Sequence, residues 1–293
     1  MNATLNPGAL LLEHFETRSR RQRGRLRRHA TLIVGLTILG LVIVASLAAP
    51  LLTHYNPDTL DPLRPLAPPL SSGHLLGTDE FGRDIFARIL YGGRIDLLIA
   101  FGATGVTLVA GTAIGLVSGY FGGWIDSVIM RIVDLFFAFP FLVLVIAIVA
   151  MLGPSIFNMF VAIWLTSWIS YARITRGHTI VAKGREYVLA AKALGYRHSR
   201  VMLRHVLPNV VSFVLIFAMV DAVGNVLLGA ALGFLGLGAT PPSPEWGAMI
   251  SDGQNYILSS WWLSTLPGVA IVIVGVGFSL LGDGLADVLR ADD

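Results

Sequence analysis

The sequence predicts an all-α integral membrane protein with about six transmembrane helices. Hydrophobic residues make up 55% of the 293 residues and charged residues only 13%, with a mean hydropathy of +0.73. A soluble domain carries about 25% charged residues and does not tolerate so much exposed apolar surface. The apolar residues also collect in uncharged runs of about 20 residues or more, the length that crosses a bilayer. The chain has no cysteine, which excludes disulfides and thiolate metal sites.

The uncharged runs locate the predicted helices. Residues 135–172 are too long for one helix, and Gly153-Pro154 divides them into two helices joined by a tight turn. The six predicted helices therefore occupy residues 30–53, residues 97–125, the two halves of 135–172, residues 210–238, and residues 265–282 with their flanks.

The positions of Lys and Arg predict the orientation, because cytoplasmic loops are enriched in these residues. Most of the 21 lie before residue 30, at Arg131, between Arg173 and Arg204, or at Arg290, which puts both termini in the cytoplasm. The basic start resembles a signal-peptide head, but the long apolar stretch without a small-x-small site favours an anchor that is retained. We expect a basic cytoplasmic segment over 1–29, a first helix over 30–53, an extracytoplasmic loop over 54–94 and a five-helix core over 95–289, with a cytoplasmic loop at 182–209.

Several classes of chemistry find no support in the chain. The only lysines, Lys183 and Lys192, follow alanines, so no phosphate-binding loop ending in Gly-Lys exists. The seven histidines form no H-E-x-x-H pattern, and no nucleophile elbow is present. The basic residues flank hydrophobic segments instead of forming a surface for nucleic acid. We therefore expect no enzyme, no metal site, no nucleic-acid partner and no cofactor bound by this chain.

Polar and helix-breaking residues inside the predicted helices are candidates for a translocation pathway. Asp221 lies within the fifth helix, with Asn225 one turn further on, and a buried carboxylate in a membrane is costly and often functional. The alternative is structural: Asp221 pairs with a cation or donor on a neighbouring helix. Pro140 is expected to kink the third helix or open its hydrogen-bond ladder, for gating or for packing.

Two further patterns indicate packing. Small residues at every fourth position allow membrane helices to approach closely. Gly111, Gly115 and Gly119 follow this spacing, as do Gly229 and Gly233, and contacts within the chain are the preferred interpretation. Near the inner end of the second and third helices, the spacing predicts an ion pair between Arg131 and Asp134 on a short interfacial helix.

Residues 184–209 form a polar, helix-prone segment in an otherwise apolar chain. The segment predicts a first helix with Val188, Ala191 and Leu194 on one side, and Gly195 then permits a positive-φ stop. A second short helix from His198 leads through Pro208 into the fifth predicted helix. A solvated loop at the lipid headgroups would not need two helices with a small apolar patch around a glycine. Docking into a groove of a cytoplasmic partner explains the pattern better.

This segment resembles the EAA loop of importer-type ATP-binding-cassette (ABC) permeases, whose pattern is E-A-A-x3-G-x9-I-x-L-P. Ala190-Ala191, Gly195 and Leu207-Pro208 match it, whereas Leu189 and His205 replace the Glu and the Ile, and Glu186 lies three residues earlier. These departures are typical of the dipeptide, oligopeptide and nickel branch. Four further segments resemble the C-type permease subunit of this branch: LGTDEFGRDIFARILYGGR, DSVIMRIVDLFFAFP, LGFLGLGATPPSPEWGAMI and FSLLGDGLADVL. The resemblance therefore covers about residues 30–289.

The resemblance implies a type I ABC importer transmembrane domain in the bacterial inner membrane, working by alternating access. Its implied partners are a homologous second permease, two ATPase subunits that use ATP and Mg²⁺, an extracytoplasmic solute-binding protein and the lipid bilayer. The residues implied for coupling to the ATPase are Glu186, Ala190, Ala191, Gly195, Leu207 and Pro208. Those implied for contact with the binding protein or the second permease are Gly77, Thr78, Asp79, Glu245 and Trp246, with a self-contained plug of the outer mouth as the equal alternative.

The function expected from these observations is ATP-driven import of di- or oligopeptides. Nickel, glutathione and opine importers share the motifs and are alternatives for the substrate. Two hypotheses come from other classes. One is a proton-coupled carrier or channel that acts alone, with Asp221 as the titrating group, and the other is a membrane scaffold that transports nothing.

Overall fold

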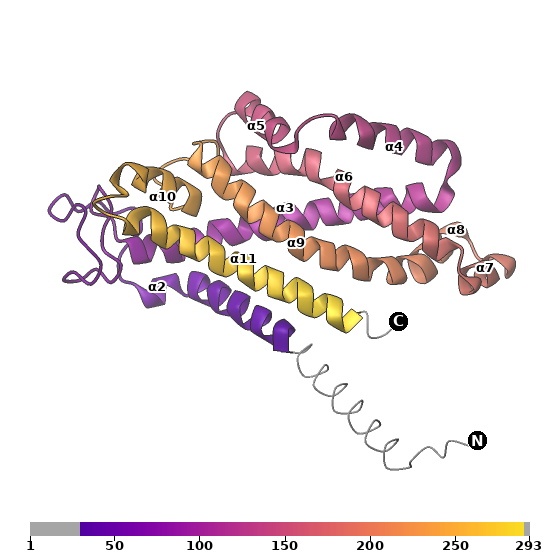
Figure 1. The fold of residues 1–293 in the computed structure, drawn as a ribbon, viewed down its shortest axis with the longest axis horizontal. Coiled ribbons are helices and arrows are strands. Elements are labelled where there is room, and N and C mark those ends of the chain that lie inside the picture. Colours follow the sequence, from indigo (N-terminus) through magenta and orange to yellow (C-terminus); the bar gives the residue numbers. More distant parts are fainter. Residues whose placement is uncertain (1–29, 290–293) are drawn as a thin grey trace, which may run out of the picture.

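Long helices run side by side through the protein, with a cap of loops at one end and a short helical hairpin at the other (Figure 1). The computed structural model describes residues 30–289. The helices are Ala30–Leu47, α2 (Ala49–Leu52), α3 (Ile85–Phe121), α4 (Gly123–Phe137), α5 (Phe141–Leu152), α6 (Ile156–Lys183), α7 (Glu186–Ala193), α8 (His198–Val201), a π-helical turn (Met202–Val206), α9 (Leu207–Phe234), α10 (Trp246–Gly253), a 3-10 turn (Gln254–Tyr256) and α11 (Trp262–Leu289). The basic segment predicted over 1–29 lies outside the described residues.

Four helices within residues 30–289 are long and apolar enough to cross a membrane: Ala30–Leu47, Ile85–Phe121, His198–Phe234 and Trp262–Leu289. The pair α4 and α5 becomes a fifth span if its two bent halves are counted together. The remaining predicted span corresponds to α6, which has 28 residues but carries polar residues such as Asn158, Arg173 and Arg176. The prediction of a multi-pass, all-α membrane protein is confirmed.

Helices α3 and α6 lie against each other through the predicted glycine face. A Cβ atom at Gly111 would collide with the carbonyl of Trp168, and one at Gly115 with the carbonyl of Ala172. Gly119 lies in the same way against α6, one turn further on. The preferred interpretation, contact within the chain, is confirmed, because only hydrogen atoms fit between the two backbones.

Helix α3 begins at Ile85, so residues 85–94 of the predicted loop are helical. The reason is local: Asp84 is the N-cap, and its side chain accepts a hydrogen bond from the backbone N–H of Ala87 at 2.7 Å. The charged residues Arg88, Arg94 and Asp96 obscured this start in the sequence, because they resemble a loop in a hydropathy profile. Each is in fact paired within the fold, as described below.

The chain bends by 84° between α4 and α5. Pro140 is the N-cap of α5, where its missing N–H costs no helical hydrogen bond. The predicted kink at Pro140 is therefore a full break between two helices. A second break at Gly153 separates α5 from α6, as predicted.

The predicted ion pair between Arg131 and Asp134 is wrong. Asp134 instead accepts a hydrogen bond from Arg173 of α6 at 2.9 Å. Asp126 likewise pairs with α6, through Nε and Nη2 of Arg176 at 2.5 and 2.6 Å. Local spacing on α4 allowed the Arg131 pair, but both acidic side chains face the neighbouring helix, where a guanidinium group meets them.

Candidate functional site

The segment 184–209 folds as the predicted hairpin of two helices, α7 and α8. Helix α7 ends in a Schellman motif: Tyr196 N–H donates to the carbonyl of Ala191 at 3.2 Å, and Gly195 N–H donates to that of Lys192 at 2.9 Å. Gly195 has a φ of +76°, and no atom lies within 4 Å of a Cβ built there. The glycine is therefore needed for the turn, and the space above it is open.

The inner face of the hairpin is apolar and packs on the end of α3. Val188, Val201 and Val206 are completely buried and Ala191 is 4% exposed, in one cluster with Tyr120 of α3. Burying an aliphatic side chain of this size contributes about 1.5–3 kcal/mol. The hairpin is therefore fixed to the transmembrane helices by its own core.

Polar contacts strengthen the same junction. The Tyr120 hydroxyl lies 3.0 Å from Nδ1 of His198, and the ammonium of Lys192 lies 5.0 Å from the centre of the Tyr120 ring. Lys183, at the end of α6, donates to the carbonyl of Gly119 at 2.7 Å. The hairpin and the end of α6 are therefore joined to the end of α3 by polar contacts as well as by the apolar cluster.

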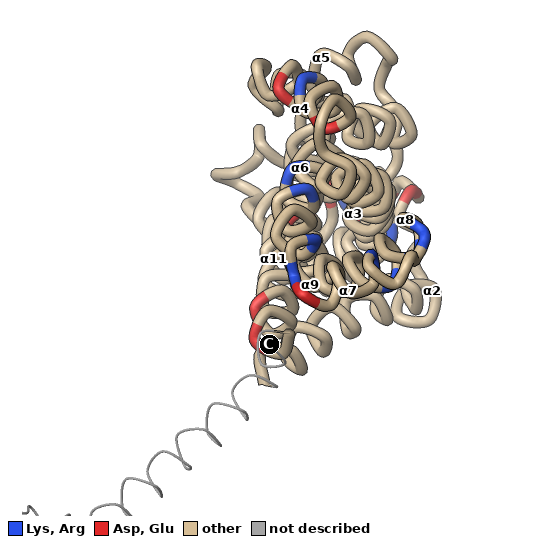
Figure 2. The backbone as a smooth tube through the Cα atoms, turned by 90° about the vertical axis from the view of Figure 1, so that its right-hand side faces the viewer, with Lys and Arg blue, Asp and Glu red and all other residues tan. Residues whose placement is uncertain are grey.

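The outer face of the hairpin is exposed and partly apolar. Leu189 is 52%, Leu194 73% and Leu203 59% exposed. Glu186 and Ala190 are also exposed, whereas Ala191 faces inward. Lys and Arg residues surround this end of the molecule (Figure 2). An exposed apolar patch on an ordered hairpin is typical of a protein-docking surface.

The second arm of the hairpin continues into α9 without a break. Residues His198–Phe234 form one 37-residue helical segment, which spans roughly 55 Å at 1.5 Å per residue. Pro208 cannot donate to the carbonyl four residues earlier, and just before it Leu207 N–H bonds to the carbonyl of Met202, as in a π-helix. Leu207 and Pro208 therefore lie at the junction between hairpin and membrane helix.

The two polar residues predicted in the fifth helix form a network between helices. The Tyr171 hydroxyl on α6 donates to Oδ2 of Asp221 at 2.9 Å, and Asn225 Nδ2 lies 2.9 Å from the same oxygen. Asn225 Nδ2 also lies 2.9 Å from Oγ1 of Thr104 on α3. The donor required by the structural interpretation of Asp221 is thus present, and the network holds α3, α6 and α9 together. A role in a pathway stays a prediction.

At the opposite end, residues 54–84 and 239–261 form what we call the loop cap. Thr78, Asp79, Glu245 and Trp246, predicted as candidate contacts, are all at most 4% exposed. The Thr78 hydroxyl donates to the carbonyl of Arg64 at 2.6 Å and accepts from a backbone N–H at 2.8 Å. Gly77 has a φ of +82°. These residues build the cap itself, and a contact with a partner stays a prediction.

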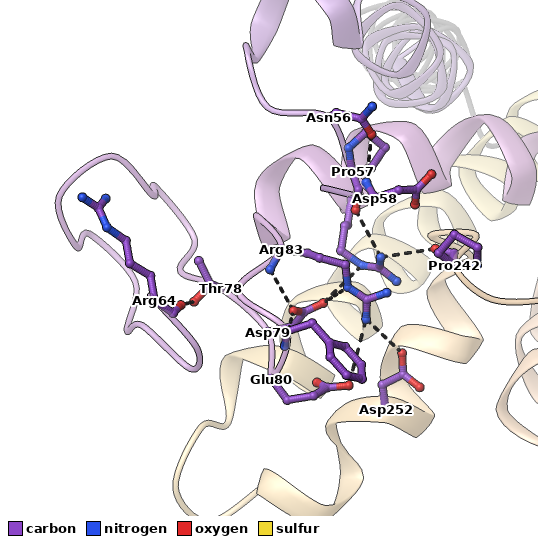
Figure 3. A network of polar contacts seen from close by, with 12 residues as sticks. Asn56, Pro57, Asp58, Arg64, Thr78, Asp79, Glu80, Arg83, Pro242 and Asp252 are labelled. Carbon is purple, nitrogen blue, oxygen red and sulfur yellow. Dashed lines mark hydrogen bonds and ion pairs between the residues drawn. The ribbon is translucent and has the colours of Figure 1, made fainter. Parts of the chain in front are cut away.

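Two buried arginines organise the loop cap: Arg88 connects it to α3, and Arg83 connects its two segments. Figure 3 shows Arg83 beside Asp79 and Asp252. Arg88 is 2% exposed, and its guanidinium donates to the carbonyls of Pro57 at 3.2 Å and Pro242 at 3.3 Å. Arg83 Nε donates to Oδ2 of Asp79 at 2.5 Å. Arg88 thus joins the two loops of the cap, which are distant in sequence, to one helix.

Two acidic residues border this network. Burial raises the pKa of Glu80, whose Oε2 is buried without a hydrogen-bond partner. Burial also raises the pKa of Asp252, while Arg83, 3.7 Å away, opposes this shift. No group of three or more His, Cys, Asp or Glu residues that could hold a metal ion occurs within 30–289.

Glu245 and Trp246 attach α10 to the membrane helices. Glu245 is the N-cap of α10, and its carboxylate accepts from the N–H groups of Gly247 and Ala248. Trp246 Nε1 donates to the carbonyl of Ile89 on α3 at 3.0 Å. Sequence reasoning found both residues, but it missed Asp96, which accepts from Trp246 N–H at 3.2 Å.

Comparison with known proteins identifies the family. Residues 111–292 match the model of the binding-protein-dependent transport system inner membrane component, and residues 17–69 match the N-terminal transmembrane domain of oligopeptide transport permease C. The chain belongs to this permease family. The permease is 43% identical over 265 residues to the dipeptide transport system permease protein DppC of Alkalihalophilus pseudofirmus, covering 90% of this chain and 87% of the relative.

Other relatives carry different substrate names. The glutathione transport system permease protein GsiD of Pectobacterium atrosepticum is 40% identical over 264 residues, covering 90% of this permease and 87% of the relative. The oligopeptide transport system permease protein OppC of Bacillus subtilis is 37% identical over 265 residues, with the same coverage. The prediction of an ABC importer permease with the type I transmembrane fold is confirmed, and in this family the ATPase is a separate subunit.

Proposed function

We propose that this permease imports di- and oligopeptides, driven by ATPase subunits that dock on the outer face of the 184–209 hairpin. The observation that carries this proposal is the two-sided hairpin. One face is locked to α3 by Val188 and Tyr120, and the other exposes Leu189 and Leu194. The substrate class is supported by relatives named for dipeptide and oligopeptide transport.

The hairpin is suited to transmitting movement because its second arm is the start of α9. Docked ATPase subunits that close on ATP and Mg²⁺ would displace Leu203 and Pro208 together with the helix. The network of Asp221, Tyr171 and Thr104 then couples α9 to α6 and α3, so the three helices respond as one body. A homologous second permease would complete the pathway, and a solute-binding protein would deliver peptide at the loop cap.

The charge distribution supports a cytoplasmic hairpin with both termini inside. Eight Lys and Arg residues lie between Arg173 and Arg204. The loop-cap end carries Arg64, Arg83, Arg88 and Arg94, of which Arg83 and Arg88 are buried. Because accessible positive charge favours the cytoplasmic side, the loop cap faces outward in this proposal, and residues 95–289 form the permease core.

Substitution of Leu194 tests the docking face. Leu194 is 73% exposed and outside the buried cluster, so Leu194→Asp is expected to leave the fold intact. Loss of its burial under a partner costs about 1–2 kcal/mol, or roughly tenfold in docking affinity, and the added charge costs more. In the reconstituted transporter, peptide-stimulated ATP hydrolysis is expected to fall at least about tenfold at limiting ATPase subunit. Leu194→Met, which keeps the apolar contact, is the matched control. Equal stimulation in Leu194→Asp and Leu194→Met would refute the docking role.

Glutathione is the second candidate substrate, because a 40% identical relative is named for it. A transporter assembled with its binding protein distinguishes the substrates by ATPase stimulation with a dipeptide, a pentapeptide, glutathione, an opine or a nickel chelate. Stimulation by the peptides alone supports the proposal. Transport by this chain reconstituted without ATPase subunits would instead support a proton-coupled or channel-like carrier that acts alone and would exclude the proposal.

A further inference from the structure

Two acidic side chains from distant parts of the chain are buried together beneath the loop cap. Asp96 lies on α3 and Glu245 caps α10, and each is 1% exposed. Glu245 directly precedes Trp246, whose N–H donates to Oδ2 of Asp96 at 3.2 Å, so the two carboxyl groups are neighbours. Two adjacent carboxylates that are both ionised and shielded from water repel each other strongly, so one of them must be neutral.

The hydrogen bonds around the pair are unequal. Both oxygens of Glu245 accept backbone N–H bonds, from Gly247 at 2.7 Å and from Ala248 at 2.8 Å. Asp96 Oδ2 accepts one bond from Trp246 N–H, whereas Asp96 Oδ1 is buried and receives no donor. A buried carboxylate oxygen without a donor is costly, but a protonated oxygen can itself donate.

Within residues 30–289, no cation on the neighbouring elements neutralises the pair. On α3, Arg88 faces Asp79 and two proline carbonyls, and Arg94 donates to the carbonyls of Ser46 and Leu47. The nearby acidic groups also have other partners: Asp252 of α10 faces Arg83, and Asp221 of α9 accepts from Tyr171. The acidic residues of α11, Asp283 and Asp287, lie at its far end.

The site is also tightly enclosed by α9. A Cβ atom at Gly233 would collide with Oε2 of Glu245, and one at Gly247 would collide with the carbonyl of Ala230. The absence of a side chain at Gly233, one of the glycines noted in the sequence, thus leaves room for the Glu245 carboxylate. Such close packing favours the smallest neutralising ligand, a proton.

We propose that Asp96 and Glu245 form a proton-binding site in which neutral Asp96 donates from Oδ1 to the Glu245 carboxylate. The assignment follows from the donors. Ionised Glu245 keeps both bonds to the start of α10, where the helix dipole also favours negative charge. Binding adds one proton to the Asp96 carboxylate and breaks no other bond. The hydrogen bond that this proton forms connects the loop cap to α3.

The site makes stability depend on pH in a definite direction. Burial raises the pKa of Glu245, against its two N–H donors. In the proposed site the pair retains one proton at a pH where both carboxyls of the unfolded chain have lost theirs. At this site the folded state then binds more protons than the unfolded state, so the contribution of the pair to stability is fully present below about pH 4 and falls as pH rises above it. The folding constant falls by up to about tenfold per pH unit until the site itself deprotonates.

The test uses the full-length permease in lipid nanodiscs. At neutral pH, its infrared spectrum is expected to contain the C=O band of a protonated carboxylic acid that disappears in Asp96→Asn. Asp58→Asn, at an exposed carboxylate, is the control and leaves the band unchanged. A band that survives Asp96→Asn would overturn the assignment.

Thermal unfolding gives an independent second reading. Asp96→Asn keeps a donor for Glu245 and an acceptor for Trp246 N–H, so it is expected to fold and to unfold at a temperature that varies less with pH than in the wild type. Glu245→Gln replaces one acceptor by a donor facing a backbone N–H and is expected to be clearly less stable. The proposal would be refuted if Asp96→Asn failed to fold, or if it lost more stability than Glu245→Gln.

Discussion

Replacing Arg88 by leucine is expected to loosen the loop cap while leaving the helix bundle assembled. Arg88 is 2% exposed, and its guanidinium supplies a donor to the carbonyls of Pro57 and Pro242. Leucine fills part of the volume but donates nothing. The Pro57 residue is buried, so its carbonyl loses its partner at a cost of about 1–3 kcal/mol.

The contacts of Arg88 with Pro242 and Asp79 contribute less to this cost in stability. Pro242 is exposed, so water can replace the guanidinium at its carbonyl. Arg88 lies 3.7 Å from the Asp79 carboxylate, and Asp79 keeps its 2.5 Å hydrogen bond from Arg83 when Arg88 is replaced. The whole change therefore costs about 2–4 kcal/mol, less than the removal of the sole partner of a buried ion.

Limited proteolysis and thermal unfolding of the purified permease measure the effect. Arg88→Leu is expected to be cleaved within residues 54–84 faster than the wild type and to unfold at a lower temperature. Arg64→Leu is the control, because the Arg64 side chain makes one exposed hydrogen bond, to the carbonyl of Ser72 at 2.8 Å, and its loss is expected to change stability by less than about 0.5 kcal/mol. If Arg88→Leu behaves like Arg64→Leu, the two loops of the cap are not held by this guanidinium.

Three further substitutions probe other parts of the structure. Gly115→Leu is expected to abolish folded expression, because even its Cβ collides with the carbonyl of Ala172; normal expression would contradict the α3–α6 packing. Tyr171→Phe removes one of the donors to Asp221 and is expected to cost about 1–3 kcal/mol in thermal or denaturant unfolding, with no loss if the hydroxyl is unimportant. The raised pKa of Glu80 means that its proton stabilises the fold at acidic pH and that this contribution is lost as pH rises; Glu80→Gln should flatten the fall of the unfolding temperature above about pH 4, and an unchanged profile would oppose this.

The hairpin and its glycine could be predicted because their signals are local. Helix propensity, the apolar spacing of Val188 and Ala191, and a glycine at the turn all lie within one short segment, and the structure has Gly195 at positive φ. The break at Pro140 is of the same kind, since proline acts on its own backbone.

What sequence reasoning missed depends on contacts between distant residues. The helix predicted from residue 97 starts too late because the charged residues Arg88 and Asp96 interrupt the apolar run, although Arg88 donates to the carbonyl of Pro242 and Asp96 accepts from Trp246 N–H. The sequence spacing predicts a partner for Asp134 on its own helix, whereas its partner in the structure, Arg173, lies on α6. The buried state of Glu245 also follows only from the fold, since an N-cap carboxylate in a loop is usually exposed.

Helix α9 contacts the hairpin at one end and the loop cap at the other, so it links the two ends of the protein. It begins in the hairpin at Pro208, and near its far end Gly233 lies against Glu245 of the loop cap. If closure of the ATPases changes the position of α9, the free energy of that change must depend on the state of the loop cap. Linkage is reciprocal, so a ligand that stabilises one arrangement of the cap alters affinity at the hairpin by the same factor. Under the proposed function, this one helix would couple substrate binding at the loop cap to the binding energy of an ATPase subunit at the hairpin.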